Sequence, residues 1–171
     1  MIIRIANQND IKLISKLYID NWQKTYKGLL SKEYLDSLTI DYAIEKWSNY
    51  ISCKNQIIFV AYEDEKFLGF TASKIDDEEN NCWYLDSLHV TETSRGKGVG
   101  TKLIKTVGKH ALDNRYKNMS ICIVRGNDNA KELYEKLGAN HYKDFVDDFG
   151  GTKSNSTKLI WNNLNALVDN Y

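Results

Sequence analysis

A glycine-rich turn, Arg95 to Gly100, has the residue types and spacing to bind an anionic ligand. It reads Arg-Gly-Lys-Gly-Val-Gly and lies between a strand-like segment that ends at Val90 and a helical pattern from about Gly98 to Asn114. The N–H groups of such a turn, at the positive end of a helix dipole, favour a pyrophosphate. Thr101 replaces the last glycine of a dinucleotide fingerprint, and Gly98 follows the Gly-Lys pair where a phosphate-binding loop of the NTPase kind needs Ser or Thr. We therefore expect a phosphate-bearing ligand of another kind.

The strands before this turn must hold it in place. Runs with the period of strands at Ile57 to Tyr62, Phe67 to Lys74 and Cys82 to Val90 are joined by short polar connections and predict an antiparallel meander. Ile2 to Ala6 predicts a short first strand, and residues 11–52 carry apolar side chains at helical spacing. The first third of the chain therefore predicts one strand and a set of helices that pack on the sheet.

The segments after the turn complete an α/β unit. Met119 to Val124 predicts a buried strand reached through a crossover helix, which makes it parallel to the strand before the turn. A helix is expected from Asn127, and Asn140 to Val146 with Ser156 to Trp161 predict a hairpin. The fold class is α/β, with a mixed sheet that is antiparallel at its start and parallel in its middle, and helices on both faces. Ligands tend to bind where such a parallel pair separates.

Composition limits the classes of function. A chain of 171 residues predicts a single domain, residues 1–171, with a short polar C-terminal tail at about 163–171. The balance of 23 basic and 23 acidic residues does not indicate nucleic acid as a partner. No apolar run approaches a membrane span of about 20 residues and the N-terminus has no signal-peptide layout, so we expect a cytoplasmic protein without a membrane partner. Three cysteines without paired spacing suggest neither disulfides nor a metal site.

Two motifs follow each other in a fixed order. The first is Leu88-His89-Val90 followed by the turn Arg95 to Gly100 and by Leu103-Ile104, and the second is Asn127-Asp128-Asn129-Ala130 followed by Leu133-Tyr134 and Leu137-Gly138. Together they resemble the GCN5-related N-acetyltransferases (GNAT). The order of elements matches the family from Ile2 to about Trp161. The resemblance implies the GNAT fold, in which the central parallel strand pair is splayed, and acetyl-CoA as co-substrate without a metal.

The resemblance also implies which residues hold acetyl-CoA. Its pyrophosphate would lie on the backbone N–H groups of the turn, and its pantetheine arm would bond the main chain of Leu88 and Val90 between the splayed strands. The Val90 N–H would donate to the thioester carbonyl, and Asn127 would help to hold the pantetheine, although it could equally cap its helix. The implied cofactor-binding residues are Leu88, His89, Val90, Arg95, Gly96, Lys97, Gly98, Val99, Gly100, Thr101, Asn127, Tyr134 and Lys136.

Tyr134 is the expected proton donor to the departing thiolate, because by resemblance it sits near the coenzyme sulfur and a phenol and a thiol have similar pKa values. The base is open. Tyr84 stands where several family members have a glutamate, and strand alternation places Tyr84, Asp86, Leu88 and Val90 on one face, away from His89. Asp86 acting through water, Tyr84, or no dedicated base are the alternatives.

The function implied is transfer of the acetyl group from acetyl-CoA to a primary amine of a small molecule or peptide in a ternary complex. The alternative is a non-catalytic acyl-CoA-binding module on the same fold. Trp22, Tyr26 and Tyr84 are the expected acceptor-binding residues, and a homodimer is left open. The acidic run Asp76 to Glu79 reads as a solvated loop. As a second hypothesis, these residues with Asp144, Asp147 and Asp148 attract a cationic acceptor such as a polyamine or aminoglycoside.

Overall fold

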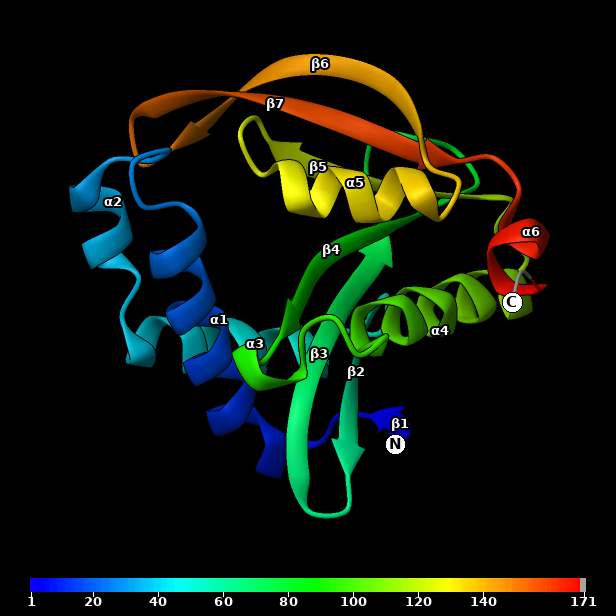
Figure 1. The fold of residues 1–171 in the computed structure, drawn as a ribbon, viewed down its shortest axis with the longest axis horizontal. Coiled ribbons are helices and arrows are strands. Elements are labelled where there is room, and N and C mark those ends of the chain that lie inside the picture. The colour runs from blue at the N-terminus through cyan, green and yellow to red at the C-terminus, as the bar shows by residue number, and fades with distance from the viewer. Residues whose placement is uncertain (170–171) are drawn as a thin grey trace.

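The chain folds into one seven-stranded mixed sheet with helices on both faces (Figure 1). A computed structural model describes residues 1–169. The strand order is β1-β2-β3-β4-β5-β7-β6, and β4–β5 is the parallel pair. The strands are β1 (Ile2–Ile5), β2 (Gln56–Glu63), β3 (Lys66–Ile75), β4 (Cys82–Val90), β5 (Asn118–Val124), β6 (Asn140–Phe149) and β7 (Thr152–Trp161). The predicted meander, crossover and hairpin are confirmed, as is the α/β class.

The helices divide between the two faces of the sheet according to the apolar side chains they present. Helices α1 (Ile11–Thr25) and α3 (Ile40–Ser52) pack on one face, where α2 (Lys32–Ser37) joins them. Helices α4 (Val99–Asp113), α5 (Asp128–Lys136) and α6 (Leu164–Asp169) contribute to the core on the other face. Short 3-10 turns, η1 (Gln8–Asp10) and η2 (Glu92–Ser94), precede α1 and the glycine-rich turn. Between residues 1 and 169, no helix is long and apolar enough to cross a membrane.

The end of the chain differs from the expected polar tail. Residues 164–169 form α6, and Leu164 and Leu167 are buried against α4. The apolar residues of this short helix lie on one side, a pattern that a polar average composition hides. The last two residues of the predicted tail lie outside the described residues.

The parallel strands β4 and β5 are paired only at their beginnings. Cys82 to Tyr84 pair with Asn118 to Ser120, and beyond these residues the strands separate. Each strand is held by its outer neighbour instead, because β4 stays on β3 to Val90 and β5 stays on β7 to Val124. The result is a V-shaped opening in the middle of the sheet, at the carboxyl ends of the two strands, where most of the predicted site residues lie.

A β-bulge in β4 corrects the predicted strand faces. Ala72 pairs with Ser87 and the next residue of β3 pairs with Leu85, so Asp86 is an extra residue. A bulge shifts the two-residue period of side chains by one position. Beyond the bulge, Leu88 and Val90 pack against the core under α4.

Asp86 therefore faces the other side of the sheet. His89 stacks on Phe70 in the core under α1 and α3, and the charge of Lys46 on α3 acts on both Asp86 and His89. The prediction that Tyr84 and Asp86 share a face with Leu88 and Val90, and that His89 points away from them, is thus wrong. Side chains alternate between the two faces on both sides of the bulge, but the bulge shifts the alternation by one residue.

A buried ion pair lies near the closed end of the V. Lys158 on β7 is 2% exposed, and its Nζ lies 2.9 Å from a carboxylate oxygen of Asp76, in the β3–β4 turn. The Ser120 hydroxyl on β5 and the Glu78 N–H also donate to Asp76. Burial alone raises the pKa of Asp76, but the hydrogen bonds from Ser120 and Lys158 outweigh it and hold the pKa below its usual value. The prediction that Asp76 belongs to a solvated loop is therefore wrong. Asp76 instead links the end of β3 to β5 and β7.

Replacing Lys158 by Met leaves the Asp76 carboxylate buried without its partner, so we expect the free energy of unfolding at pH 7 to fall by about 3–5 kcal/mol. The matched control is Lys143→Met. Lys143 pairs with Glu78 and Glu79 at the surface, where water screens the charges, so its loss should lower the free energy of unfolding far less. Urea denaturation measures both, and equal losses contradict the role of the buried pair.

The same pair predicts a dependence of stability on pH. Because the folded pKa of Asp76 is lowered, its contribution is present above the unfolded pKa of about 4 and is lost as the pH falls further. The double variant Asp76→Asn with Lys158→Met should therefore lose less stability below pH 5 than the wild type does. Parallel stability curves for the two proteins would rule this out.

Candidate functional site

A cleft of about 1070 Å³ follows the opening between β4 and β5. Its walls come from α1, the end of β4, the glycine-rich turn with the start of α4, β5, and the start of α5 (Figure 1). The predicted site residues that line it are Trp22, Tyr26, Asp86, Leu88, His89, Val90, Arg95, Gly96, Gly98, Val99, Gly100, Thr101, Asn127 and Tyr134. Residues distant in sequence thus meet in one concave site.

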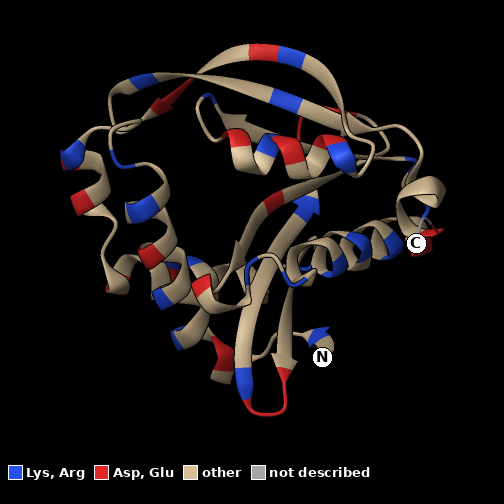
Figure 2. Ribbon diagram, in the orientation of Figure 1, with Lys and Arg blue, Asp and Glu red and all other residues tan. Residues whose placement is uncertain are grey.

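The glycine-rich turn forms an N–H-rich wall at the start of α4. Gly96 and Gly98 have φ angles of +71° and +77°, which side-chain-bearing residues rarely adopt, and Gly98 occupies the position before the helix. The first intrahelical bond runs from the Lys102 N–H to the Gly98 carbonyl, so the N–H groups before Lys102 remain for a ligand. Figure 2 marks the Lys and Arg residues of this turn in blue. The helix dipole adds to the attraction for an anion.

Gly100 has no packing reason to be glycine. A Cβ built there would meet side chains of Leu133, Leu88 and Val90 at 3.7 Å, which is ordinary contact. The protein itself therefore has room for a larger residue. Glycine at this point of the cleft instead allows a ligand to approach the backbone closely, which fits a phosphate-bearing group.

The open edge of β4 offers main-chain groups to the cleft. The Thr91 N–H donates to Leu68 of β3, and paired residues of an antiparallel ladder alternate between bonded and non-bonded pairs. The N–H and C=O groups of Leu88 and Val90 therefore point away from β3, into the V. This is the geometry by which an extended ligand can be added to a strand edge.

The three cationic side chains that were predicted to bind the coenzyme have different surroundings. Arg95 is at the rim of the cleft and donates to Asn21 of α1 at 2.8 Å. Lys97 is exposed in the turn. Lys136 lies at the far end of α5, where its Nζ is 2.7 Å from Glu132, and it belongs to a separate small pocket, so the structure does not bring it to the cleft as predicted.

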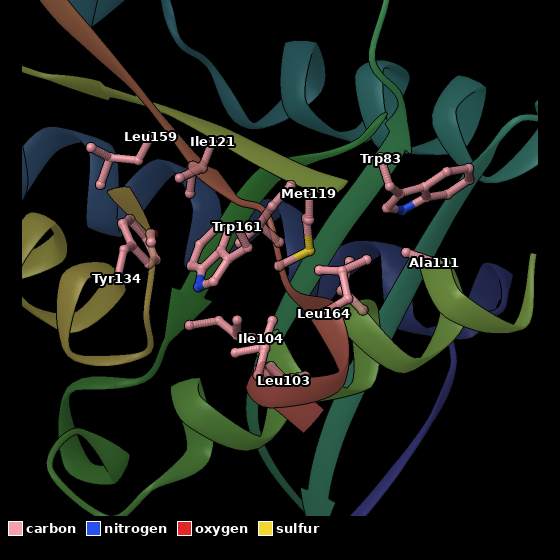
Figure 3. Close-up of a cluster of buried hydrophobic side chains, with 14 of the residues drawn as sticks. Trp83, Leu103, Ile104, Ala111, Met119, Ile121, Tyr134, Leu159, Trp161 and Leu164 are labelled. Carbon is pink, nitrogen blue, oxygen red and sulfur yellow. The ribbon is translucent and has the colours of Figure 1, made fainter. Parts of the chain in front are cut away.

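Asn127 and Tyr134 bring α5 into the cleft. Within the described residues the Asn127 side chain caps no helix N–H; it donates to the Tyr26 hydroxyl at 3.5 Å, so the capping alternative is not realised. Tyr134 is buried and lies edge-on to Trp161, with ring centroids 5.8 Å apart (Figure 3). Burial raises the pKa of the Tyr134 phenol, which therefore stays protonated at neutral pH.

Asp86 lines the cleft, as does the exposed Asp128 at the start of α5. Burial raises the pKa of Asp86, and the charges of Lys46 and Lys74 only partly offset this effect. A carboxylate with a raised pKa, in a cleft, is suited to accept a proton. Tyr84, by contrast, lies outside the cleft beside Cys122, and burial raises the pKa of its phenol. The structure therefore brings Asp86, but not Tyr84, to the site.

Aromatic residues close the cleft on the side of α1. The rings of Trp22 and Tyr26 are 4.5 Å apart, and Trp22 also contacts Tyr34 of α2 and Phe149 of β6. These contacts make Trp22 and Tyr26 partly structural, yet both line the cleft. Their role in binding the acceptor stays a prediction. Asn21 also lines it and was missed by the sequence analysis, because a single Asn on a helix carries no local signal.

The described residues of the site include neither a set of metal ligands nor an activated thiol. Among residues 1–169 no group of His, Cys, Asp and Glu is arranged to hold a metal ion. Cys122 lines the cleft, but burial raises the pKa of its thiol, and burial raises the pKa of Cys82 to about 11. Both are thiols rather than thiolates near pH 7, so neither is poised to carry an acyl group.

A family model supports the sequence motifs. The model described as "Acetyltransferase (GNAT) family" matches residues 16–139, which include the turn, Asp86 and Tyr134. Over 170 residues the chain is 25% identical to YuaI, an uncharacterized N-acetyltransferase of Bacillus subtilis (strain 168), and this match covers 96% of the chain and 95% of YuaI. The thialysine N-epsilon-acetyltransferase of Bos taurus is 38% identical over 56 residues, one third of each protein.

Solved structures share the fold. The PaiA N-acetyltransferase of Thermoplasma acidophilum, in complex with coenzyme A, superposes with a TM-score of 0.72 at 24% identity, over 92% of this chain and 98% of that one. YncA of Salmonella typhimurium, with its cofactor acetyl-CoA, superposes with a TM-score of 0.74 at 17% identity, over 100% and 95%. At these identities the likeness concerns the fold alone.

The state of the cysteines can be tested directly. Exposed Cys53 should react with iodoacetamide at pH 7.5 at least about tenfold faster than Cys122, because the thiolate is the reactive form and burial disfavours it. Peptide mass spectrometry over time gives both rates. If Cys122 is labelled first, it is an activated thiolate and a covalent acyl-enzyme route must be reconsidered.

Proposed function

The chain belongs to the GNAT family of acetyltransferases, and we propose that it transfers the acetyl group of acetyl-CoA directly to a primary amine of a small molecule or peptide. The observation that carries this proposal is the meeting, in one cleft, of the N–H-rich turn, the open main chain of β4 and the buried phenol of Tyr134. Each of these supplies one requirement of the reaction: anion binding, carbonyl polarisation and protonation of the leaving group.

Acetyl-CoA supplies an activated acyl group as a thioester, and the chain must hold and polarise it. The N–H groups between Gly96 and Thr101 bind the pyrophosphate, and the left-handed glycines and Gly100 let it approach the backbone. Leu88 and Val90 bond the amides of the pantetheine arm along the edge of β4. The Val90 N–H donates to the thioester oxygen and stabilises the negative charge that develops there.

Two proton transfers accompany the acyl transfer. Tyr134, protonated because of its raised pKa, donates a proton to the departing thiolate. Asp86 accepts a proton, through water, from the ammonium form of the acceptor, and the neutral amine that remains attacks the thioester carbon. The Asp86 side chain lies on the face of β4 opposite to Val90 and lines the same cleft. Tyr84 is not used as a base because its raised pKa keeps it neutral.

The acidic run Asp76 to Glu79 does not favour a cationic acceptor. Asp76, Glu78 and Glu79 are within ion-pair distance of Lys158, and Asp77 pairs with Lys74. Cations of this chain therefore compensate much of the charge of this run, so the run contributes little to attracting polyamines or aminoglycosides. The acceptor is proposed only as a primary amine that fits beside Trp22 and Tyr26.

The experiment that tests the function is release of free thiol from acetyl-CoA with a panel of amines and amino-terminal peptides. We expect release that depends on an amine, and Tyr134→Phe should lower kcat by about 10²–10⁴ while coenzyme affinity stays similar, because only the proton donor is lost. Calorimetry with CoA serves as the control for binding. Tight binding of CoA without release for any amine would indicate a non-catalytic acyl-CoA-binding module instead.

The role of Asp86 predicts the pH dependence. Asp86 accepts a proton only when ionised, so kcat/KM should fall as the pH is lowered through its pKa, and the fall should begin at higher pH than for an ordinary carboxylate. Asp86→Asn should remove this acidic limb and lower kcat/KM by about 10²–10⁴. The same variant should raise the Tm at pH 7. Folding raises the pKa of Asp86, so ionised Asp86 destabilises the folded protein, and asparagine removes this cost. An unchanged limb in Asp86→Asn would show that Asp86 is not the base.

A further inference from the structure

Asn21, near the end of α1, joins three elements at one point of the cleft. The residue is 7% exposed, its Oδ1 accepts from an Arg95 guanidinium N–H at 2.8 Å, and its Nδ2 donates to the Val90 carbonyl at 3.3 Å. A guanidinium only donates and a carbonyl only accepts, so the two partners fix the orientation of the amide. Asn21 therefore links α1 to the glycine-rich turn and to the end of β4.

The second amide hydrogen of Asn21 also has a partner. Nδ2 lies 3.4 Å from Nδ1 of His89, whose ring stacks on Phe70 and meets Tyr18 edge-on. Burial and the charges of Lys46 and Arg95 lower the pKa of His89 to about 3. The imidazole is neutral at pH 7 and can accept at Nδ1, so this contact fits a hydrogen bond.

The place of these contacts matters because the end of β4 has no strand on its open side. Beyond Tyr84, β4 has lost β5 as a neighbour, and the N–H and C=O of Val90 face the V. The Val90 carbonyl is held there by Asn21 and, at 3.4 Å, by Arg95 Nε. In the extended backbone of β4 the carbonyl and the N–H of Val90 point to the same side and are linked through the two backbone torsions of this residue, so holding the carbonyl restricts the torsions that set the direction of the N–H.

We propose that Asn21 is a positioning residue for the thioester: it sets the Val90 N–H against the carbonyl oxygen of the acetyl group and holds Arg95 at the rim of the turn. This inference rests on the proposed function, in which Val90 is the donor. Small errors in placement weaken such a donor strongly, because stabilisation of developing charge depends on a preset distance and angle. A purely structural Asn21 would affect stability without distinguishing an acetylated coenzyme from a free one.

Two variants separate the contacts of Asn21. Asn21→Asp keeps the acceptor for Arg95 and loses the donor to Val90, whereas Asn21→Ala loses both. The readouts are kcat, Tm, and the ratio of the Kd values for acetyl-CoA and CoA by calorimetry. CoA lacks the thioester carbonyl of acetyl-CoA but has the same pyrophosphate. Effects of the added charge, or of Arg95, on pyrophosphate binding therefore cancel in the ratio.

We expect both variants to raise the ratio of Kd for acetyl-CoA to Kd for CoA by about fivefold or more. They should also lower kcat by about tenfold or more, which is a smaller effect than the complete loss of the donor would have. The matched control is Glu92→Gln. It breaks the Lys24–Glu92 pair at 2.7 Å, which also joins α1 to the segment before α4 but is exposed. This control should leave the ratio and kcat unchanged.

The outcomes separate this inference from the proposed function. If the wild type releases thiol with an amine and both Asn21 variants keep its ratio and kcat, the positioning role is overturned and the function stands. A lower Tm with an unchanged ratio likewise overturns it, because it indicates a structural role only. If the wild type shows no transfer, the proposed function fails. An unchanged ratio in the Asn21 variants then overturns the positioning role as well. A raised ratio in these variants still supports the positioning role.

Discussion

The separation of β4 from β5 is the constraint on which the site depends. The two strands pair at only three positions, and each then follows its outer neighbour. A continuous sheet at this point would satisfy the main chain of Leu88 and Val90 with β5 and leave no cleft. The opening leaves these groups exposed to a ligand, and it places the start of α4 and the start of α5 on either side of it. The buried Lys158–Asp76 pair fastens the strands near the closed end, where they still pair.

The bulge at Asp86 places the side chains before it and those after it on different faces of β4. Before it, the side of the strand that faces α3 carries Tyr84 and Asp86; after it, Leu88 and Val90 face α4. A regular strand would have placed the carboxylate on the same face as Leu88 and Val90. The extra residue instead leaves the proposed base on the face toward α1 and α3, while the open edge of β4 remains for the proposed coenzyme. The proposed direct transfer needs both substrates bound at once, and two separate places in one cleft agree with that proposal.

The sequence predicted the strands, the crossover and the glycine-rich turn because each has a local pattern: a period of two, a period near 3.6, or a glycine where φ is positive. It could not predict what depends on distant partners. The bulge arises from pairing with Ala72, the burial of Asp76 arises from Lys158, and Lys136 lies far from the cleft because α5 points its last turn away. Asn21 has no motif at all; only its contacts with Val90 and Arg95 reveal it.

The position of the thioester in the V tests this account most directly. A crystal structure of the protein with acetyl-CoA, or with a stable ketone analogue, gives the distance from the Val90 nitrogen to the carbonyl oxygen. We expect about 2.7–3.1 Å, with the pantetheine arm along β4, its pyrophosphate on the N–H groups of residues 96–101, and the sulfur beside Tyr134. A coenzyme bound elsewhere, or a carbonyl directed away from Val90 and held by other groups, would contradict the central claim.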